Sequence, residues 1–578
     1  MPDQSGVKNY AMTPDEDQAL FMETIQLFSQ LQTWRNVFAG QWEEVAALIL
    51  PTSRNTFFYG NFNWPGQKKS EQQVDSTGMV ALHRFAAILD SLLTPRNMVW
   101  HGLKSDNDDI MKDRQARLWY EQATKTLFKL RYAPTANFSS QNQQQYQSLG
   151  AFGTGGMFID QAVDQAGNLV AGFRYKAIPL GELFLLENHQ GLVDGFVRWF
   201  RLTALQAAKK WGKERLPANL LPALENQSQD LFDFLHVVQA NKDYRHRALG
   251  PVGKKFSSYY ACIQGQCIMD RGGYHTFPLA ASRYDQAPQE TYGRSPAMMV
   301  LPSLKTLNAE KRTFLKQGHR AGDPVLLTAD DGLIDVSLKP GAMNKGGMSL
   351  DGKPLVGVLP TGSIQVTKEM MDEEKSLIND MFLVSLFQIL AESPQMSATE
   401  VIERVNEKGI LIAPVVGRQG DEYLGPMIDR EVNLAAEMGL LPPMPEILRQ
   451  AGGDYGVNYT SPLARAARAQ EAAGFMRVVE TATNIATATG DPSIFDNFDF
   501  DTALPDIGYI QSVPESWMSD PKQMQAKRQA RQQAAQAQQQ IQAAPAAAAL
   551  MSAHAKQAQA GLPPQPVAQP GQGQPPQG

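Results

Sequence analysis

Residues 291–318 read TYGRSPAMMVLPSLKTLNAEKRTFLKQG, a pattern typical of one long helix with a defined start. Ser295 has the side chain of an N-cap residue, and Pro296 suits the first helical position. Leucines follow at helical spacing, and Gly318 is placed to end the helix. Pro302 lies inside it, and we expect a kink or a local break there.

A second helix of matched length is predicted from Thr367 to Ala391, just before Ser393-Pro394. At about 1.5 Å per residue, each helix would span roughly 35 Å. Between them, residues 319–365 are rich in glycine, which favours short strands and tight turns. Two matched helices can run antiparallel and carry this lobe away from the body, which makes the lobe a projecting contact surface.

The bulk composition describes an ordinary soluble protein of several domains. The chain has 578 residues, of which 43% are hydrophobic and 19% charged, and its net charge is −6. About three or four domains are expected. The negative charge argues against a general grip on nucleic acid. No apolar run approaches the roughly 20 residues of a membrane span, and residues 1–17 lack the apolar core of a secretory signal. Cytosolic synthesis is expected, with Cys262 and Cys267 reduced rather than a redox pair.

The first 290 residues favour a mixed body, with helices first and strands later. We predict helices over 17–50, 75–93, 108–131, 137–150 and 203–213. We predict strands over 157–163, 169–178, 183–187, 192–200, 231–238, 257–262 and 266–270. An aromatic loop, residues 56–69, suits either a stacking surface for bases or a loop packed against the core; we favour the second.

Beyond residue 394 the pattern is again helical. A capping box at Ser397–Glu400 starts a helix through Lys408, and a further helix is predicted from Pro426 to Met438. The Ala-rich stretch Pro462–Thr489 is interpreted as a packed helix pair. From about Pro521 the chain is rich in Gln and Ala, then in Pro, Gln and Gly, so we expect disorder, or a helix formed only against neighbouring subunits.

No catalytic constellation is found in the sequence. Residues 250–255 lack the spacing of a phosphate loop, and Gly153–Gly156 precedes a strand, so both are interpreted as turns. The histidines lack metal-ligand spacing, and His83 is interpreted as a core residue. We therefore predict no catalytic residue, no metal and no cofactor, and a protein that is not an enzyme.

Several elements together resemble a known family. They are Tyr292–Ser295 followed by Leu304–Asn308, Met396–Glu400 leading into a helix, Asp75–Trp100, Thr460–Gln470, and the Gln/Ala-rich end. In this order and spacing, they resemble the portal (head-to-tail connecting) proteins of short-tailed, T7-like bacteriophages. The resemblance covers most of residues 17–520.

The resemblance implies an α+β, mainly helical fold with wing, stem, clip and crown, assembled as a ring that is commonly of twelve subunits. Carried onto this chain, the wing is 1–290, the first stem helix 291–318, the clip 319–365 and the second stem helix 366–391. Residues 392–456 would be the tunnel loop and inner wing, 457–520 the crown, and 521–578 a tail that is flexible or helical only in the ring.

The resemblance also implies a function and partners. The ring would sit in the virion at the portal vertex, initiate capsid assembly, conduct double-stranded DNA without sequence specificity during packaging and ejection, and hold the tail. Its partners would be the terminase large subunit, which hydrolyses ATP, the tail adaptor, and the major capsid and scaffolding proteins; no membrane is implied. Two other functions stay open: a cytosolic enzyme with a site around Gly153–Asp160 and His275, and a non-viral oligomeric scaffold.

Two groups of polar side chains are candidates for this function. Those that would face DNA in the channel are Lys305, Lys311, Arg312, Lys316, Lys368, Lys375, Glu392 and Gln395. We favour a second interpretation of the cations, in which they pair between subunits with Glu310, Asp372, Glu373 and Glu374. Those that would meet partners at the clip are Asp330, Asp331, Lys339, Asn344, Lys345 and Lys353.

Overall fold

The computed structural model describes most of the chain up to residue 538. The described residues are 14–51, 57–58, 73–164, 167–246, 248–328, 335–360, 364–384, 413–453, 455–459, 462–490, 492–510, 513, 517–519, 523–538 and 552. They fall into two compact units, Met1–Phe498 and Asp499–Gly578.

The first unit begins with helices, as predicted. They are α1 (Pro14–Leu48), α2 (Thr77–Leu93), α3 (Asp108–Lys112), α4 (Arg114–Arg131) and α5 (Phe138–Phe152). The single helix predicted over 108–131 is wrong, because Asp113 has extended backbone and separates α3 from α4. Its carboxylate accepts the N–H of Ala116, so Asp113 caps α4 instead of continuing α3.

Two antiparallel sheets follow the helices. The first has the order β3-β2-β9 and the second β4-β5-β6-β7-β8. The strands are β2 (Thr154–Val163), β3 (Leu169–Ile178), β4 (Leu183–Glu187), β5 (Val193–Thr203), β6 (Leu231–Ala240), β7 (Phe256–Cys262), β8 (Cys267–Tyr274) and β9 (Leu279–Arg283). Between β5 and β6 lie α6 (Ala204–Trp211) and α7 (Leu221–Glu225).

The predicted strands are confirmed, but β9 was missed. All residues of β9 are buried, so its sequence shows no alternation of apolar and polar side chains. The two cysteines face each other across the β7–β8 hairpin and are free thiols.

Residues 413–459 return to this body. A helix runs over 413–419, continues as the π-helix Gly420–Leu424, and becomes α13 (Gly425–Glu437). The α-helix α13 thus starts within one residue of the predicted Pro426, but the prediction missed the helical residues 413–424 before it. Proline lacks an N–H and its ring disturbs α-helical bonding, and here the wider π-turn lies directly before it. Further on come α14 (Glu446–Gln450) and β12 (Gly456–Tyr459), which pairs with β1 (His101–Lys104).

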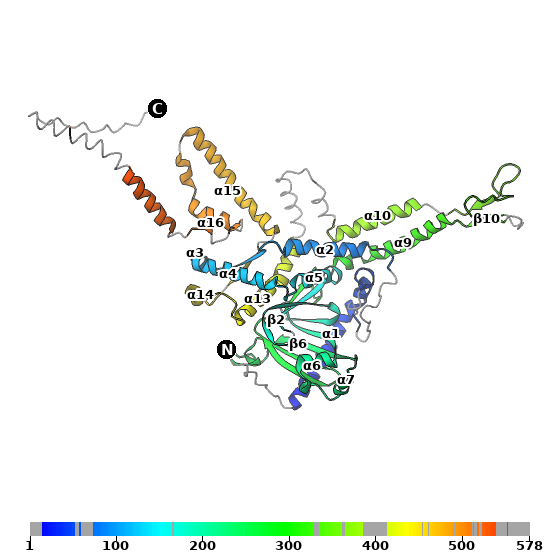
Figure 1. Ribbon diagram of the computed structural model, residues 1–578, viewed down its shortest axis with the longest axis horizontal. Coiled ribbons are helices and arrows are strands. Elements are labelled where there is room, and N and C mark those ends of the chain that lie inside the picture. Colours follow the sequence, from blue (N-terminus) through cyan, green and yellow to red (C-terminus); the bar gives the residue numbers. More distant parts are fainter. Residues whose placement is uncertain are drawn as a thin grey trace, which may run out of the picture. The chain divides into compact units, whose positions relative to one another are not determined.

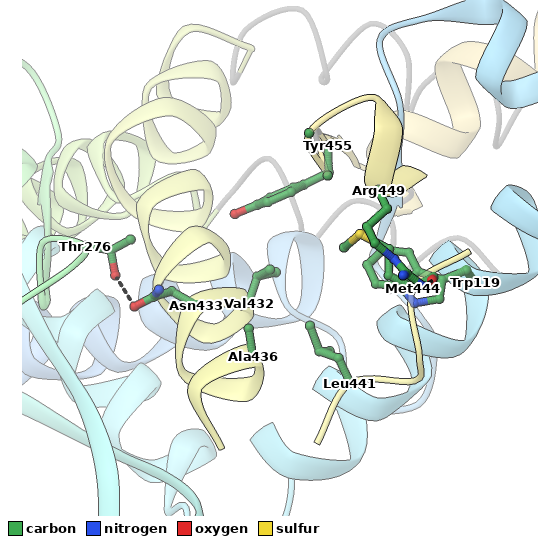
Figure 2. Close-up of a pocket in the computed structure, with 11 residues that line it drawn as sticks. Trp119, Thr276, Val432, Asn433, Ala436, Leu441, Met444, Arg449 and Tyr455 are labelled. Atoms are coloured by element: carbon green, nitrogen blue, oxygen red, sulfur yellow. Dashed lines mark hydrogen bonds between the residues drawn. The ribbon is translucent and has the colours of Figure 1, made fainter. Parts of the chain in front are cut away.

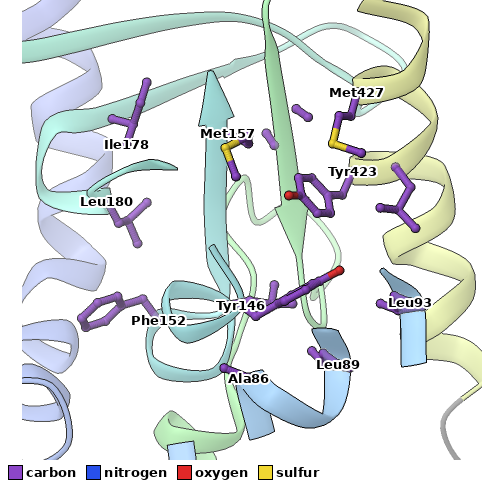
Figure 3. Packing of buried hydrophobic residues seen from close by; sticks show 14 of the residues in the cluster. Ala86, Leu89, Leu93, Tyr146, Phe152, Met157, Ile178, Leu180, Tyr423 and Met427 are labelled. Carbon is purple, nitrogen blue, oxygen red and sulfur yellow. The ribbon is translucent and has the colours of Figure 1, made fainter. Parts of the chain in front are cut away.

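The core of the first unit lies between α1, α2, α5, the first sheet and α13. Figure 3 shows Leu89 and Leu93 from α2, Tyr146 from α5, Met157 from β2 and Tyr423 from the π-helix, all buried in this cluster. A smaller cluster joins α1 to the second sheet, where the rings of Phe28 and Phe184 meet edge to face at 5.0 Å.

The helices predicted to form a pair lie side by side, with a two-stranded hairpin at their far end (Figure 1). The elements are α8 (Pro296–Met299), α9 (Leu301–Gly322), β10 (Leu326–Thr328), β11 (Val356–Val358) and α10 (Ile364–Met381). The predicted break is confirmed: Val300 separates α8 from α9, and Pro302 lies in the first turn of α9. The predicted end at Gly318 is wrong. A glycine costs only about 1 kcal/mol in a helix, and good helix formers surround it.

The predicted second helix is interrupted after Met381. Phe382 and Val384 are both buried, whereas these positions would point about 200° apart on a continuous helix. A turn with Leu383 at φ 60° lets both side chains enter the core. Glu392, Gln395 and the predicted capping box at Ser397–Glu400 lie outside the described residues.

The chain continues with long helices. The helix α15 (Pro462–Thr489) is single, so the predicted helix pair is wrong; its alanine-rich sequence has a high helix propensity throughout. In the second unit, α16 (Phe500–Ile510) and a helix over 523–538 are joined by an ion pair between Arg528 and Asp501 at 2.5 Å. Of the described helices, none combines the length and the apolar character of a membrane span.

Candidate functional site

The start of the paired helices is locked into the core by the motif Tyr292–Ser295. The hydroxyl of Tyr292 accepts the N–H of Leu185 at 3.2 Å. The N–H of Gly293 donates to Thr154 at 2.8 Å. The hydroxyl of Ser295 accepts the N–H of Met298 at 2.9 Å, as predicted for an N-cap, and donates to a carbonyl of α5 at 2.8 Å.

Gly293 is required because its backbone touches that of Gly153. A Cβ on either glycine would lie 2.3 Å from the carbonyl oxygen of the other. Gly153 also has φ 75°, which a glycine adopts without strain, and it ends α5. The predicted turn at Gly153–Gly156 is confirmed at Gly153 only, and the close approach explains why that residue is glycine. The prediction is wrong for Thr154–Gly156, which belong to β2 and pair with β9.

The inner end of α9 is fixed by one amide and one ion pair. The side-chain oxygen of Asn308 accepts the N–H groups of Val74 and Asp75, at 2.8 and 3.1 Å. Lys305, a predicted channel residue, instead forms an ion pair with Glu44 on α1 at 2.7 Å. These contacts hold α9 against α1 and the segment before α2.

The contact between α9 and α10 is apolar on the inner side and polar further out. Leu304 and Leu307 on α9 and Met371 and Ile378 on α10 are buried. Thr367 donates its hydroxyl hydrogen to Gln317 at 3.0 Å. Because the helices are antiparallel neighbours, this hydrogen bond fixes which residues of α9 and α10 lie level with each other.

The two helices expose opposite charges. Every exposed ionisable side chain of α9 other than His319 is a lysine or arginine: Lys305, Arg312, Lys316 and Arg320. On α10 the exposed charged residues are acidic except for one lysine: Glu369, Asp372, Glu373, Asp380 and Lys368. The predicted cations Lys311 and Lys375 are half-buried, and Lys375 pairs with Asp372 at 2.8 Å, which lowers the pKa of that carboxyl.

Glu310 lies on α9 near two acids of α10. Partial burial raises its pKa, and the charges of Glu374 and Glu373 raise it further. Glu310 therefore has acidic rather than basic neighbours on α10.

The lobe between α9 and α10 exposes both polar and apolar side chains. The predicted residues Lys339, Asn344, Lys345 and Lys353 are all exposed, whereas Asp330 and Asp331 lie outside the described residues. Asn344 bonds both the N–H and the carbonyl of Ser337, at 2.8 and 3.0 Å, so it holds the lobe together.

The sequence did not predict the apolar surface of this lobe. Met343 is 86% exposed and Leu350 is 108% exposed, and Leu338 and Met348 are more than 60% exposed. Scattered among glycines without period 2 or 3.6, these residues gave no signal of a shared surface. Exposed apolar side chains gathered in one lobe are typical of a docking surface.

The body behind the helices is joined by buried ion pairs. Glu431 on α13 bonds Arg131 on α4 through both oxygens and accepts the hydroxyl of Tyr175 on β3 at 2.6 Å. Both charged side chains are fully buried. Burial lowers the pKa of Arg131, but the nearby carboxylate of Glu431 more than offsets this, so the net pKa is above its ordinary value.

Arg283 on β9 makes a second such junction. It pairs with Glu187 at the end of β4 and with Glu422 in the π-helix, the latter at 3.0 Å. The two junctions connect residues 420–437 to both sheets and to α4, so this late segment belongs to the body.

A cavity of about 400 Å³ lies beside α13 (Figure 2). Val432 and Ala436 line it from α13, and Leu441, Met444 and Trp119 face them. The described residues that line it include no Asp, Glu, His, Cys or Lys, so these residues supply no carboxylate, imidazole or amine for general base chemistry.

The structure also shows where the remaining residues singled out in the sequence lie. His83 is exposed on α2 and contacts Gln147 at 3.0 Å, so its interpretation as a core residue is wrong. His275 is exposed, while Asp160 faces Arg430 at 3.5 Å. Phe57, from the aromatic loop, is buried against Trp42 and Phe152, which agrees with the favoured interpretation for that residue. No cluster of metal-ligating side chains is found in the part of the chain that the structure describes.

Comparison with known proteins gives consistent matches. The model of a family described as bacteriophage head to tail connecting protein matches residues 22–518. The chain is 25% identical over 491 residues to the probable portal protein of Bordetella phage BPP-1, covering 82% of this chain and 84% of that one. It is 26% identical over 533 residues to the portal protein of Salmonella phage epsilon15, covering 89% and 91%.

A solved structure is also similar. A chain of the virion of a native gene transfer agent particle aligns with 70% of this chain and 85% of its own, at 11% identity and a TM-score of 0.34. A TM-score this low supports no argument about the fold.

Proposed function

The chain belongs to the bacteriophage head-to-tail connecting protein family, and from this premise we propose how its parts build a DNA conduit. Its function is that of a phage portal, and its place is in the virion at the capsid vertex. The parts proposed below are the ring, the channel, the domains and the partners.

Copies of the chain stand in a closed ring of twelve, the number that the resemblance implies. The ring surrounds a channel, and α9 and α10 form its stem. The observation that carries this proposal is the antiparallel helix pair with a lobe at its far end (Figure 1). A pair fixed at the inner end by Asn308 and the Lys305–Glu44 ion pair can hold its outer end away from the body.

The wing is built from residues 1–290 together with the later segment of 392–456. The buried ion pairs of Glu431 and Glu422 support this assignment, because they join that segment to α4 and to both sheets. Residues 457–520 form the crown, and 521–578 the tail.

The lobe between the stem helices is the clip, and it meets the terminase large subunit during packaging and the tail adaptor afterwards. Its exposed Leu338, Met343, Met348 and Leu350 support docking of a protein partner. Asn344 has a different part, since its amide bonds Ser337 within the lobe. Major capsid and scaffolding proteins surround the wing.

DNA passes through the channel without sequence readout and without tight binding. Each phosphate neutralised by a cation adds salt-dependent affinity, which would slow a sliding duplex. The net charge of −6 per chain suits such a conduit. The role is structural, and ATP is hydrolysed by the motor rather than by this chain. Glu392 and Gln395 stay candidate channel residues.

The experiment separates the clip from the ring. Met343→Asp/Leu350→Asp should leave the particle size in sedimentation velocity unchanged, while binding of the purified terminase large subunit and tail adaptor is lost. The matched control is Leu249→Asp, since Leu249 is 89% exposed on the body. Binding that survives the clip variant, or rings that fall apart in it, would contradict the assignment.

A further inference from the structure

The stem helices carry complementary charge on their exposed faces. Four exposed basic side chains lie on α9 and four exposed acidic ones on α10, as described above. The ion pairs of Lys305 and Lys375 run to α1 and along α10. Within one chain, the charge of Lys311 on α9 also acts on Asp372 of α10 and helps to lower the pKa of that carboxyl. Opposite charge on two faces of one subunit is what a head-to-tail contact between identical copies requires.

Basic residues of α9 and acidic residues of α10 also lie at the same height along the direction of the helix pair. The Thr367–Gln317 hydrogen bond sets the level. Arg312 lies five residues before Gln317 on α9, and Asp372 lies five residues after Thr367 on α10, so these two residues are at the same height along the antiparallel pair. In the same way Lys316 is level with Lys368, which is one residue, or about 1.5 Å, from Glu369.

The acidic residues Glu369 and Asp372 share one side of α10. The buried stripe of α10, with Met371 and Ile378, faces its own α9. Glu369 lies about 200° round the helix from Met371, so it faces away from that contact. Asp372 lies about 100° round from Met371, to one side of the contact and next to Glu369 on the helix surface.

We propose that α9 of each copy packs against α10 of the next, so that Arg312 and Lys316 pair with Asp372 and Glu369 of the neighbouring copy. The inference rests on the ring of the proposed function and names the contact that closes it. Rotation about a ring axis parallel to the stem does not move a residue along that axis. A residue of one copy therefore meets residues of the next copy that lie at the same height. The basic face of α9 then binds protein rather than DNA.

The test is a charge swap in the full chain. Arg312→Glu/Lys316→Glu reverses the basic face, Glu369→Lys/Asp372→Lys reverses the acidic face, and the four changes together restore opposite charges. Lys209→Glu/Lys213→Glu is the matched control, because both lysines are exposed on the body. Sedimentation velocity over a concentration series, in about 0.1 M salt, gives the concentration at which half of the chain is in rings.

Each double variant should raise that concentration by about tenfold or more, because like charges then face each other at every contact of the ring. The fourfold variant should return it to within about threefold of the wild type. The restored ring also shows that the double variants fail through charge and not through misfolding.

Two results would overturn the inference while leaving the ring itself in place. One is a pair of double variants that assemble like the control. The other is that the double variants still form rings and differ from the wild type only in how well they retain DNA. That result would place the basic face of α9 on the channel. A wild-type chain that forms no ring at all would instead contradict the proposed function.

Discussion

Glu431 is the centre of one of the two buried polar junctions of the body. It bonds Arg131 from α4 and Tyr175 from β3 while lying on α13. Removing one member of a fully buried ion pair leaves the other without a partner, and this costs more than the pair itself contributes.

Glu431→Gln should therefore lower the free energy of unfolding by about 3–5 kcal/mol. Urea unfolding followed by circular dichroism measures it. Glu446→Gln is the control, since its ion pair with Arg449 is about two-thirds exposed and should matter by less than about 1 kcal/mol. If the two substitutions lower the free energy of unfolding equally, burial does not determine how much the Arg131–Glu431 ion pair matters for stability.

Acid should destabilise the body through two buried histidines. Burial lowers the pKa of His101 and of His236 well below 6.5, and nearby cations lower both further. The unfolded chain takes up a proton on each near pH 6.5 and the folded chain does not, so stability falls as the pH drops below about 6.5.

His101→Gln should flatten this pH dependence by up to about 1.4 kcal/mol per pH unit. Since Arg131 can only donate, the nitrogen of His101 that lies 2.8 Å from it accepts, and glutamine keeps an acceptor that does not titrate. The free energy of unfolding from pH 5 to 7 measures the effect, with exposed His83→Gln as the control. An unchanged slope in His101→Gln would contradict this assignment.

Gly153 and Gly167 distinguish backbone strain from a steric clash. Both have positive φ, but a Cβ at Gly153 would meet the carbonyl of Gly293, whereas one at Gly167 would meet open space. Gly167→Ala should cost about 1 kcal/mol of stability, and Gly153→Ala at least about 3 kcal/mol, because α5 and α8 must also separate. Thermal unfolding of both variants checks the difference, and similar costs would mean that the close approach is easily relaxed.

Among the elements, the lobe should melt separately from the body. It is held by short strands and by the Asn344–Ser337 hydrogen bonds, with little buried apolar surface. Asn344→Ala should cost about 1 kcal/mol of local stability, visible as faster hydrogen exchange over 335–358 with an unchanged thermal midpoint. Lys345→Ala is the control. A shift of the global midpoint would contradict the independence of the lobe.

The sequence predicted those elements whose side chains repeat with a clear period. The strands of both sheets other than β9, and the long helices α1 and α9 apart from the end of α9, were found in this way. The predictions from sequence were wrong where tertiary packing determines the backbone conformation. Asp113 caps a new helix, and the turn at Leu383 allows both Phe382 and Val384 to be buried. These choices depend on neighbours far away in the chain.

The candidate site was predicted in outline rather than in detail. The paired helices, the cap at Ser295 and the break near Pro302 follow from local sequence rules. The partner of Lys305, the level of Arg312 with Asp372 and the exposure of Met343 require the tertiary structure, because they depend on how distant segments are placed.

At the scale of the whole molecule, the proposed ring gives each of these parts a role. In it the body would supply a base held by buried ion pairs, the helix pair would surround the axis, and the apolar lobe would meet the partners at one end. The opposite charges of α9 and α10 would make each contact identical to the next, as a closed ring requires.

The central claim is that α9 and α10 of every copy surround a passage. Cryo-electron microscopy of the purified full-length protein tests it most directly. We predict a closed ring with a central hole, in which α9 and α10 alternate around the axis and the lobes lie at one end. A single subunit, or a ring in which these helices lie on the outer surface away from the axis, would contradict the claim.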